Sequence, residues 1–281
     1  MKAMILAAGL GTRLRPLTDT IPKALVELNG RTLLEITIDR LKSFGVTEMI
    51  VNVHHHAEKI AAFLKSKNNF GLRIELSRED DLLLDTGGGL KKAAWFFQEG
   101  NSQEPFLLHN VDVLSTIDFR QMLDAHNKTS ALATLAVQRR PSSRQLLFDE
   151  HNLLIGRRIN NTDTLVREQD IRDAALNDCH SERSEESAFS SGSALASRLL
   201  RESSTRGPAP LAFSGIHIIS PRLLPLITEC GVFSIIDTYL RLAQSGEKIA
   251  AFRADSFYWR DLGRPEDLRE ASTDLTRGVL L

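Results

Sequence analysis

Glycines and cationic side chains follow one another in a short stretch after the first apolar run of the chain. The run covers residues 2–8, and Gly9, Gly11, Arg13 and Lys23 come after it. A glycine lets the backbone bend and approach a ligand closely, because it carries no Cβ atom. Arginine and lysine supply the positive charge and the hydrogen-bond donors that bind phosphate groups. The stretch therefore indicates a phosphate-binding loop at the end of a buried strand.

Two other phosphate-binding motifs and an ordinary turn also contain closely spaced glycines. A Rossmann dinucleotide loop requires a third glycine where this chain has Leu14, and the acidic residue expected about 20 positions later has no clear candidate. A Walker A loop ends in Gly-Lys-Ser or Gly-Lys-Thr, which is absent here. On this fragment alone, the interpretation as a plain strand-to-helix turn stays open, although such a turn rarely contains so many cations.

Apolar runs with strand-like and helix-like spacing alternate through the first half of the chain. Strands are expected at 2–8, 48–53, 72–77, 105–114 and 131–137, and helices at 32–45, 56–66, 88–98 and 117–128. This alternation predicts an α/β fold, a Rossmann-like, mostly parallel sheet flanked by helices. Ligands of such sheets bind outside the carboxyl ends of the strands, so the loop at 9–15 lies on the expected functional edge.

The pattern changes at about residue 141. Residues 145–159 have the spacing of a hairpin, which predicts a small β-rich lobe. Residues 173–208 are dense in Ser, Glu and Arg, and their composition predicts a solvated low-complexity insertion. Regular patterns resume at 211–219, 234–246, 248–254 and 257–272, where Trp259 and Phe257 are expected to be core residues.

Composition and charge exclude several classes of protein. The 281 residues carry a net charge of -1, so no basic field recruits nucleic acid. The two cysteines, Cys179 and Cys230, have neither metal-ligand spacing nor a disulfide framework, which is typical of a reducing cytoplasm. No apolar stretch approaches the roughly 20 residues that span a bilayer, and the first residues lack the features of a signal peptide. We expect a cytoplasmic protein without nucleic-acid or membrane partners.

The opening loop resembles the hallmark of the sugar-1-phosphate nucleotidylyltransferases, G-x-G-T-R-[ML]-x-P-[LM]-T followed by Pro-Lys. This chain has GLGTRLRPLT and then, after a short spacer, Pro22 and Lys23. The stretches DTGGG, HNVD, FSGI and WRDLG follow in the family's order. DTGGG is similar to the loop of short bacterial members, N-acetylmuramic acid 1-phosphate uridylyltransferases in particular. In HNVD, Val111 replaces the glycine of the family's NGD motif.

The resemblance implies that a sugar-1-phosphate oxygen attacks the α-phosphorus of a nucleoside triphosphate and releases pyrophosphate. Two anions must meet, so cations and Mg²⁺ are required. On the matched motifs, the catalytic residues are Arg13, Lys23 and Asp112, and the metal ligands are Asp112 and Asp261. The sugar phosphate is assigned to Lys23, Asn110 and Gly215, and the nucleotide to Ala8, Gly9, Gly11, Thr12, Arg13, Asp85, Thr86 and Gly87. Outside the family context, each of the two aspartates could be a turn residue or a helix cap.

The same resemblance implies one domain over residues 1–281. Its parts would be a nucleotide-binding core at 1–140, a sugar-binding lobe at 141–220 and a segment at 221–281 that completes the metal site. The implied substrates are UTP and N-acetylmuramic acid 1-phosphate, in cell-wall nucleotide-sugar synthesis, by a monomer or homodimer. A mannose- or heptose-1-phosphate guanylyltransferase is the alternative, and a non-catalytic nucleotide sensor a remote one. His54, His55 and His56 follow a strand and are expected at the solvent edge or at the rim of the pocket, with His55 the one to contact nucleotide or sugar.

Overall fold

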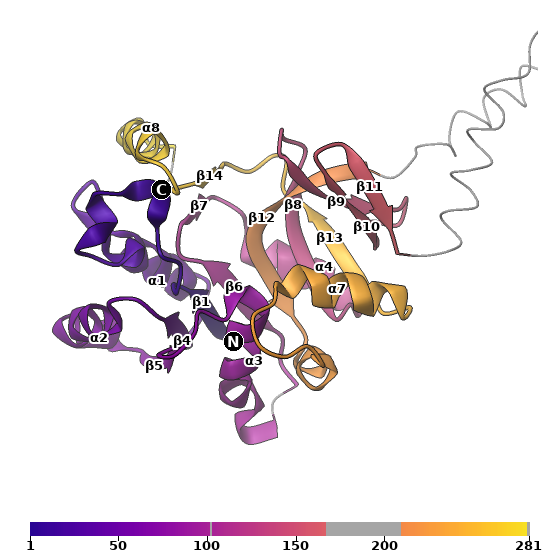
Figure 1. The fold of residues 1–281 in the computed structure, drawn as a ribbon, viewed down its shortest axis with the longest axis horizontal. Coiled ribbons are helices and arrows are strands. Elements are labelled where there is room, and N and C mark those ends of the chain that lie inside the picture. Colours follow the sequence, from indigo (N-terminus) through magenta and orange to yellow (C-terminus); the bar gives the residue numbers. More distant parts are fainter. Residues whose placement is uncertain (102, 167–208, 280–281) are drawn as a thin grey trace, which may run out of the picture.

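The protein folds as a mixed β-sheet with helices on both faces (Figure 1). The computed structural model describes residues 1–101, 103–166 and 209–279, so the predicted insertion at 173–208, with Cys179, lies outside the described residues. Within that part, the main sheet has ten strands in the order β11-β10-β9-β12-β6-β1-β4-β5, with β8 and β13 joined to β12. The predicted fold class is confirmed.

The elements have the following bounds. The main-sheet strands are β1 (Lys2–Leu6), β4 (Glu48–Val53), β5 (Arg73–Arg78), β6 (Phe106–Asn110), β8 (Ala133–Gln138), β9 (Arg144–Phe148), β10 (Leu154–Ile159), β11 (Thr162–Leu165), β12 (Ala209–Ile219) and β13 (Ile249–Arg253). Two small sheets pair β2 (Glu27–Leu28) with β3 (Arg31–Thr32) and β7 (Val113–Ser115) with β14 (Trp259–Asp261). The helices are α1 (Leu33–Ser43), α2 (Ala57–Ser66), α3 (Asp85–Gln98), α4 (Phe119–Thr129), α7 (Ile235–Gln244) and α8 (Pro265–Thr276).

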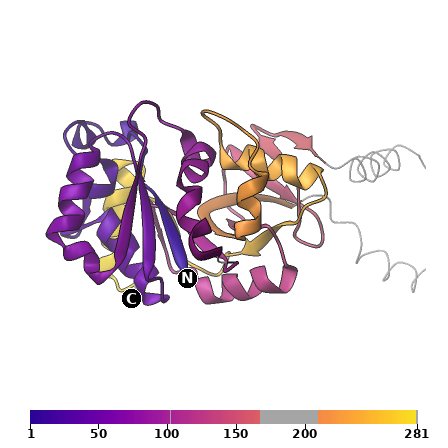
Figure 2. The ribbon, with the colours of Figure 1, turned by 90° about the horizontal axis from the view of Figure 1, so that it is seen from below.

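The first half of the sheet is parallel. Strand β1 pairs with β4 and β6, and β4 pairs with β5, all in parallel register. The carboxyl ends of these strands therefore meet at one edge, where the loop after β1 begins. Figure 2 shows the strands of this half lying between helices on either side.

Alternate residues of β1 enter two separate cores. Ala3 and Ile5 pack into the core that contains buried residues of α1, α2, α4 and α8. Met4 packs into the core formed with α3 and α7. Successive side chains of a strand point to opposite faces, so a continuous apolar run is what a strand covered on both faces requires.

The second half contains the predicted hairpin, in which β9 and β10 pair antiparallel. Strand β12 joins the two halves, because it runs antiparallel to β6, β8 and β9. Its register with β8 shifts between Phe213 and His217, around Gly215, whose φ is +74°. A glycine is favoured at such a bulge, since it adopts positive φ without steric cost.

Three expectations from the sequence need correction. The run 105–114 is two strands, β6 and β7, and Asp112 lies in the break between them. The helix expected at 88–98 begins earlier, at Asp85, so all three glycines of DTGGG lie within the first two turns of α3. Trp259 is half-buried and lines a cavity. Among the described residues, no helix is long and apolar enough to cross a membrane.

Candidate active site

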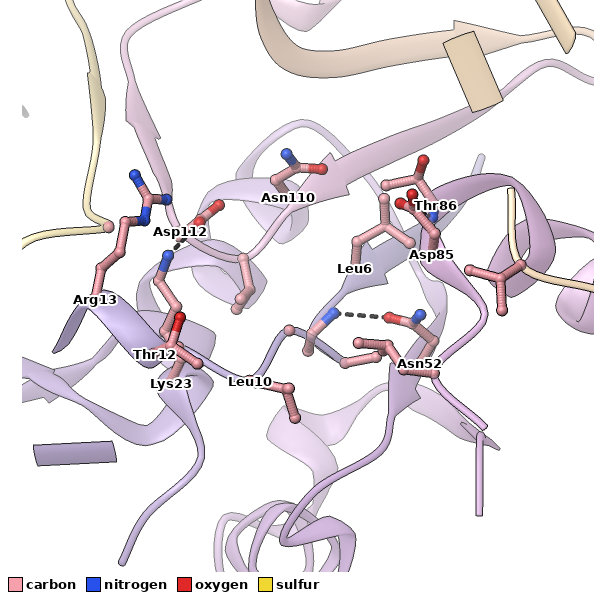
Figure 3. A pocket seen from close by; sticks show the side chains of 18 residues that line it. Leu6, Leu10, Thr12, Arg13, Lys23, Asn52, Asp85, Thr86, Asn110 and Asp112 are labelled. Atoms are coloured by element: carbon pink, nitrogen blue, oxygen red, sulfur yellow. Dashed lines mark hydrogen bonds and ion pairs between the residues drawn. The ribbon is translucent and has the colours of Figure 1, made fainter. Parts of the chain in front are cut away.

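A cavity of about 520 Å³ lies at the carboxyl edge of β1, β4 and β6 (Figure 3). Most of the predicted site residues line it, namely Ala8, Gly9, Gly11, Thr12, Arg13, Lys23, Asp85, Thr86, Asn110 and Asp112. Gly87, Gly215 and Asp261 are the predicted site residues that do not. The parallel half of the sheet thus brings together residues from three segments that are distant in sequence, 8–23, 85–86 and 110–112.

The loop after β1 is shaped by Gly11. Its φ is +64°, and a Cβ atom there would lie 2.9 Å from Cγ2 of Thr18 and 3.1 Å from Cβ of Lys23. The carbonyl of Gly11 also accepts hydrogen bonds from the Leu14 N–H and the Thr18 hydroxyl, both at 2.8 Å. Gly9 differs, because a Cβ atom there would meet nothing within 4 Å. Gly11 therefore serves the protein's own packing, whereas Gly9 leaves open space beside the cavity.

Cationic and acidic side chains meet at one end of the cavity. The ammonium group of Lys23 forms an ion pair with Oδ2 of Asp112, and the Lys23 side chain is only 9% exposed. The Arg13 guanidinium lies 4.0 Å from Oδ1 of Asp261 and is 56% exposed, so it can turn toward a ligand. Figure 3 shows Arg13, Lys23 and Asp112 together at this end.

The pairing of β7 with β14 brings Asp261 near Asp112. Asp261 lies opposite Val113 in the register, and the Leu262 N–H donates to the Asp112 carbonyl at 2.8 Å. Gly263 completes the arrangement, because a Cβ atom there would lie 2.4 Å from Oδ1 of Asp261 and 2.6 Å from the Arg13 guanidinium. Burial and, next, the charge of Asp112 raise the pKa of Asp261 above its ordinary value. Two carboxylates thus repel each other here.

A buried polar network shapes the opposite end of the cavity. The side-chain oxygen of Asn52 accepts a hydrogen bond from the Ala7 N–H at 2.7 Å, and its amide group donates to Glu79 at 2.8 Å. The second oxygen of Glu79 accepts from the Leu84 N–H at 2.8 Å. The network therefore joins the loop after β1 to the start of α3. Asn52 lines the cavity, although no motif in the sequence marks it as a site residue.

The three glycines of α3 are needed for packing. A Cβ atom at Gly87 would lie 2.3 Å from the Phe233 ring, one at Gly88 2.7 Å from the Gly231 carbonyl, and one at Gly89 2.8 Å from the Asn52 amide. The Gly87 N–H donates to the Phe233 carbonyl at 3.0 Å, so it is already engaged within the protein. Asp85 and Thr86, which directly precede these glycines in α3, line the cavity.

A second cavity of about 880 Å³ lies between the core and the β-rich lobe. Arg13 and Asn110 line both cavities, so the two are neighbours. Gly215 and Asp261 line the second one. Gly215 also permits close packing, since a Cβ atom there would lie 2.8 Å from the Asn110 amide nitrogen. The side-chain oxygen of Asn110 is buried and has no hydrogen-bond partner among the described residues, which leaves it available to a ligand.

The remaining candidates lie elsewhere. None of the three consecutive histidines lines either cavity, and Nδ1 of His54 lies 2.5 Å from the Glu79 carbonyl oxygen. Arg15, a further cation of the loop after β1, pairs with Asp19 at 3.2 Å on the surface. Apolar residues that the sequence analysis did not single out complete the first cavity, namely Leu6, Leu10, Leu83 and Val232. No sequence motif marks these positions, because any apolar residue could form such a wall.

Comparison with solved structures gives the fold. HddC from Yersinia pseudotuberculosis has a TM-score of 0.68 and 19% identity to this chain, and the match covers 98% of this chain and 99% of HddC. The fold is thus that of the nucleotide-diphospho-sugar transferases.

Sequence comparison gives the family. The nucleotidyl transferase family model matches residues 2–146. The chain is 30% identical over 266 residues, 94% of its length, to N-acetylmuramate alpha-1-phosphate uridylyltransferase of Caulobacter vibrioides, and the match covers 92% of that protein. It is 37% identical over 138 residues to mannose-1-phosphate guanyltransferase of Aspergillus fumigatus, which is 49% of this chain and 37% of that protein. The chain belongs to the nucleotidyl transferase family and, within it, to the sugar-1-phosphate nucleotidyltransferases.

Proposed function

We propose that this protein transfers a uridylyl group from UTP to N-acetylmuramic acid 1-phosphate and releases pyrophosphate. The ion pair of Lys23 with Asp112 carries the proposal, because it lies in the first cavity together with Arg13 and Asn110, which also line the second. A nucleotide in one cavity and a sugar phosphate in the other would bring their phosphates together at this ion pair. The full-length similarity to the Caulobacter vibrioides uridylyltransferase supports this choice of substrates.

The nucleotide would extend along the first cavity. Its base and ribose would lie at the end formed by Asn52, Asp85 and Thr86, where polar groups and apolar walls occur together. Its phosphates would lie along residues 9–13, where backbone N–H groups and Arg13 are available as donors. The buried oxygen of Asn110 would accept a hydrogen bond from a hydroxyl group at the junction of the cavities.

The reaction forms a bond between the sugar-phosphate oxygen and the α-phosphorus and breaks the bond from that phosphorus to the bridging oxygen of pyrophosphate. Lys23 would hold the two phosphates in line as negative charge accumulates between them. Arg13 would bind the departing pyrophosphate through paired N–H groups. Both cations already lie at the cavity wall, so little rearrangement is needed.

Asp112 and Asp261 would hold Mg²⁺. Carboxylate oxygens are hard ligands. Burial and, next, the charge of Asp112 raise the pKa of Asp261, and a cation between the two carboxylates would offset their repulsion. Among the described residues, no group of three or more His, Cys, Asp or Glu side chains is placed to form a complete metal cage. An ion held by two carboxylates and by substrate phosphates fits this donor set. When bound, Mg²⁺ would offset the negative charge of the phosphates.

A panel of nucleotides tests the proposal. With Mg²⁺, we expect UTP to raise the melting temperature more than GTP, CTP, ATP or dTTP. A ligand at 100 times its Kd stabilises by about 2.7 kcal/mol, which corresponds to roughly 5–10 °C for a domain of this size. Pyrophosphate release with UTP and N-acetylmuramic acid 1-phosphate completes the test. Failure to release pyrophosphate with any nucleotide and sugar-1-phosphate in a broad panel would refute the enzymatic proposal.

A guanylyltransferase is the second candidate. The first half of the chain is more similar to the Aspergillus fumigatus enzyme, at 37% identity, than the whole chain is to the uridylyltransferase. The same panel separates the two. Stabilisation by GTP and turnover with mannose 1-phosphate would replace the uridylyl proposal and leave the reaction class unchanged.

The two loop glycines give a matched pair of variants. Gly9→Ala is expected to leave the melting temperature nearly unchanged, because its Cβ atom meets no protein atom, and to weaken UTP binding at least tenfold if the backbone lies against the nucleotide. Gly11→Ala is expected to lower the melting temperature, since positive φ and the contact with Thr18 cost about 1–3 kcal/mol. Thermal shift and UTP titration measure both. Unchanged UTP affinity in Gly9→Ala would contradict a close approach at this residue.

A further inference from the structure

Three arginines that line the second cavity form no ion pair within the part of the chain that the structure describes. Arg140, Arg144 and Arg264 all contribute to its wall. Among the described residues none of the three lies within 4.0 Å of a carboxylate oxygen, whereas Arg158 and Arg260 are paired with carboxylates. Unpaired guanidinium groups that share one cavity create a site for a negatively charged group.

Arg140 is held in place by its neighbours. The centre of its guanidinium group lies 3.8 Å from the centroid of the Trp259 ring, and one N–H donates to the Phe213 carbonyl at 2.6 Å. The Trp259 ring is itself fixed, because its N–H donates to the Ser214 carbonyl at 2.7 Å. The Nε atom of Arg140 is buried and has no partner among the described residues. A fixed guanidinium with an unused donor is preorganised for an acceptor.

Arg144 provides the second charge. It is the first residue of β9, on the same short segment as Arg140, and its side chain is exposed and forms no ion pair among the described residues. The acidic residues of the cavity wall are Asp261 and Asp267. Asp261 lies beside Arg13, at the end shared with the first cavity, where the sugar 1-phosphate would meet the nucleotide.

A neutral sugar does not account for these arginines. Hydroxyl groups both donate and accept, whereas a guanidinium only donates. The 1-phosphate would be bound at the shared end, by Lys23 and Arg13. We propose that Arg140 and Arg144 bind a carboxylate that the sugar carries at a position remote from its 1-phosphate. This inference rests on the proposed function, and it specifies which residues recognise the sugar.

Two substrates that differ in one group provide the test. N-acetylmuramic acid 1-phosphate is N-acetylglucosamine 1-phosphate with a lactyl ether, which bears the carboxylate. We expect the wild-type protein to prefer the acid by at least tenfold in kcat/KM, measured by pyrophosphate release with UTP. Arg144→Gln should lower kcat/KM for the acid about 10- to 100-fold, since a hydrogen bond between charged groups accounts for a factor of this size. For the neutral sugar, kcat/KM of this variant should stay within about threefold of the wild-type value.

Further variants separate binding from folding. Arg144 is exposed, so Arg144→Gln is expected to fold normally, and Arg140→Lys keeps the charge at the packed position while removing the paired donors. Arg139→Gln is the matched control, because Arg139 adjoins Arg140 but does not line the cavity. Arg139→Gln should leave kcat/KM unchanged for both the acid and the neutral sugar. Equal losses for the acid and the neutral sugar in Arg144→Gln, or no preference for the acid in the wild type, would overturn the proposal.

A binding measurement keeps this inference distinct from the proposed function. Free N-acetylmuramic acid and N-acetylglucosamine contain no phosphate, so their binding can be measured without any turnover. Ligand-observed NMR is expected to detect the acid with the wild-type protein and a weaker signal with Arg144→Gln. Binding of the acid without any turnover would reject the reaction and retain the carboxylate site. Absence of both binding and turnover would reject both.

Discussion

Asp112→Asn is expected to lower kcat by about a thousandfold or more, which corresponds to roughly 4 kcal/mol of transition-state stabilisation. The substitution removes one of the two carboxylates proposed to hold Mg²⁺. The fold should survive, because an asparagine oxygen can still accept a hydrogen bond from Lys23, which is its partner in the structure. Burial and, next, the charge of Asp112 raise the pKa of Asp261, and loss of that charge removes the second of these causes.

The measurement is pyrophosphate release at several Mg²⁺ concentrations, together with a melting curve. Asp261→Asn should cause a comparable loss, since it removes the second carboxylate of the pair. Asp124→Asn is the control, because Asp124 is exposed on α4 and lines neither cavity. Near-normal activity of Asp112→Asn at limiting Mg²⁺ would show that this residue is not a metal ligand.

The loop after β1 could be predicted because its signals are local. Gly9 and Gly11 follow an apolar strand within a few residues, and cations follow at once. The structure places this loop at the carboxyl edge of the sheet, as expected. Even so, the pattern did not distinguish the two glycines. Gly11 is required by contacts with Thr18 and Lys23, which only the folded loop creates.

The second aspartate could be assigned only through the resemblance. Asp261 approaches Asp112 because β7 and β14, each three residues long, pair as a small sheet. Strands this short carry little periodic signal, and their pairing is decided by distant packing. A turn residue and a metal ligand were therefore equally compatible with the local pattern.

Asn52 was missed for a related reason. It lies in a buried strand whose sequence, EMIVNV, reads as an apolar run with one polar interruption. Its function depends on Ala7 and Glu79, which lie 45 and 27 residues away in the chain. A buried polar residue needs partners, but the sequence does not indicate which ones. Gly87 is a second example. Phe233 requires a glycine at this position, and Phe233 is distant in the chain.

Acid is expected to destabilise the protein well before its carboxylates are protonated. Three buried histidines are neutral in the folded state: burial lowers the pKa of His109 to about 4, of His126 to about 4 and of His217 to about 3. An unfolded histidine has a pKa of about 6.5. Below that pH the unfolded chain binds protons that the folded protein does not, so stability is complete above pH 6.5 and falls as the pH decreases toward 4.

The free energy of unfolding should fall by about 2 kcal/mol per histidine, or about 6 kcal/mol for all three, between pH 7.5 and pH 5. That is comparable with the whole stability of an ordinary domain, about 5–15 kcal/mol. Urea unfolding at several pH values measures the slope. His126→Asn should reduce this slope by about one third, because it removes one of the three histidines. The fold should survive, since the asparagine side chain can still pair with Thr134, the partner of His126 at 2.9 Å. His151→Asn, at an exposed residue of the β9–β10 turn, should leave the slope unchanged. A wild-type stability that stays constant from pH 7.5 to pH 5 would mean that these histidines take up protons within the folded protein.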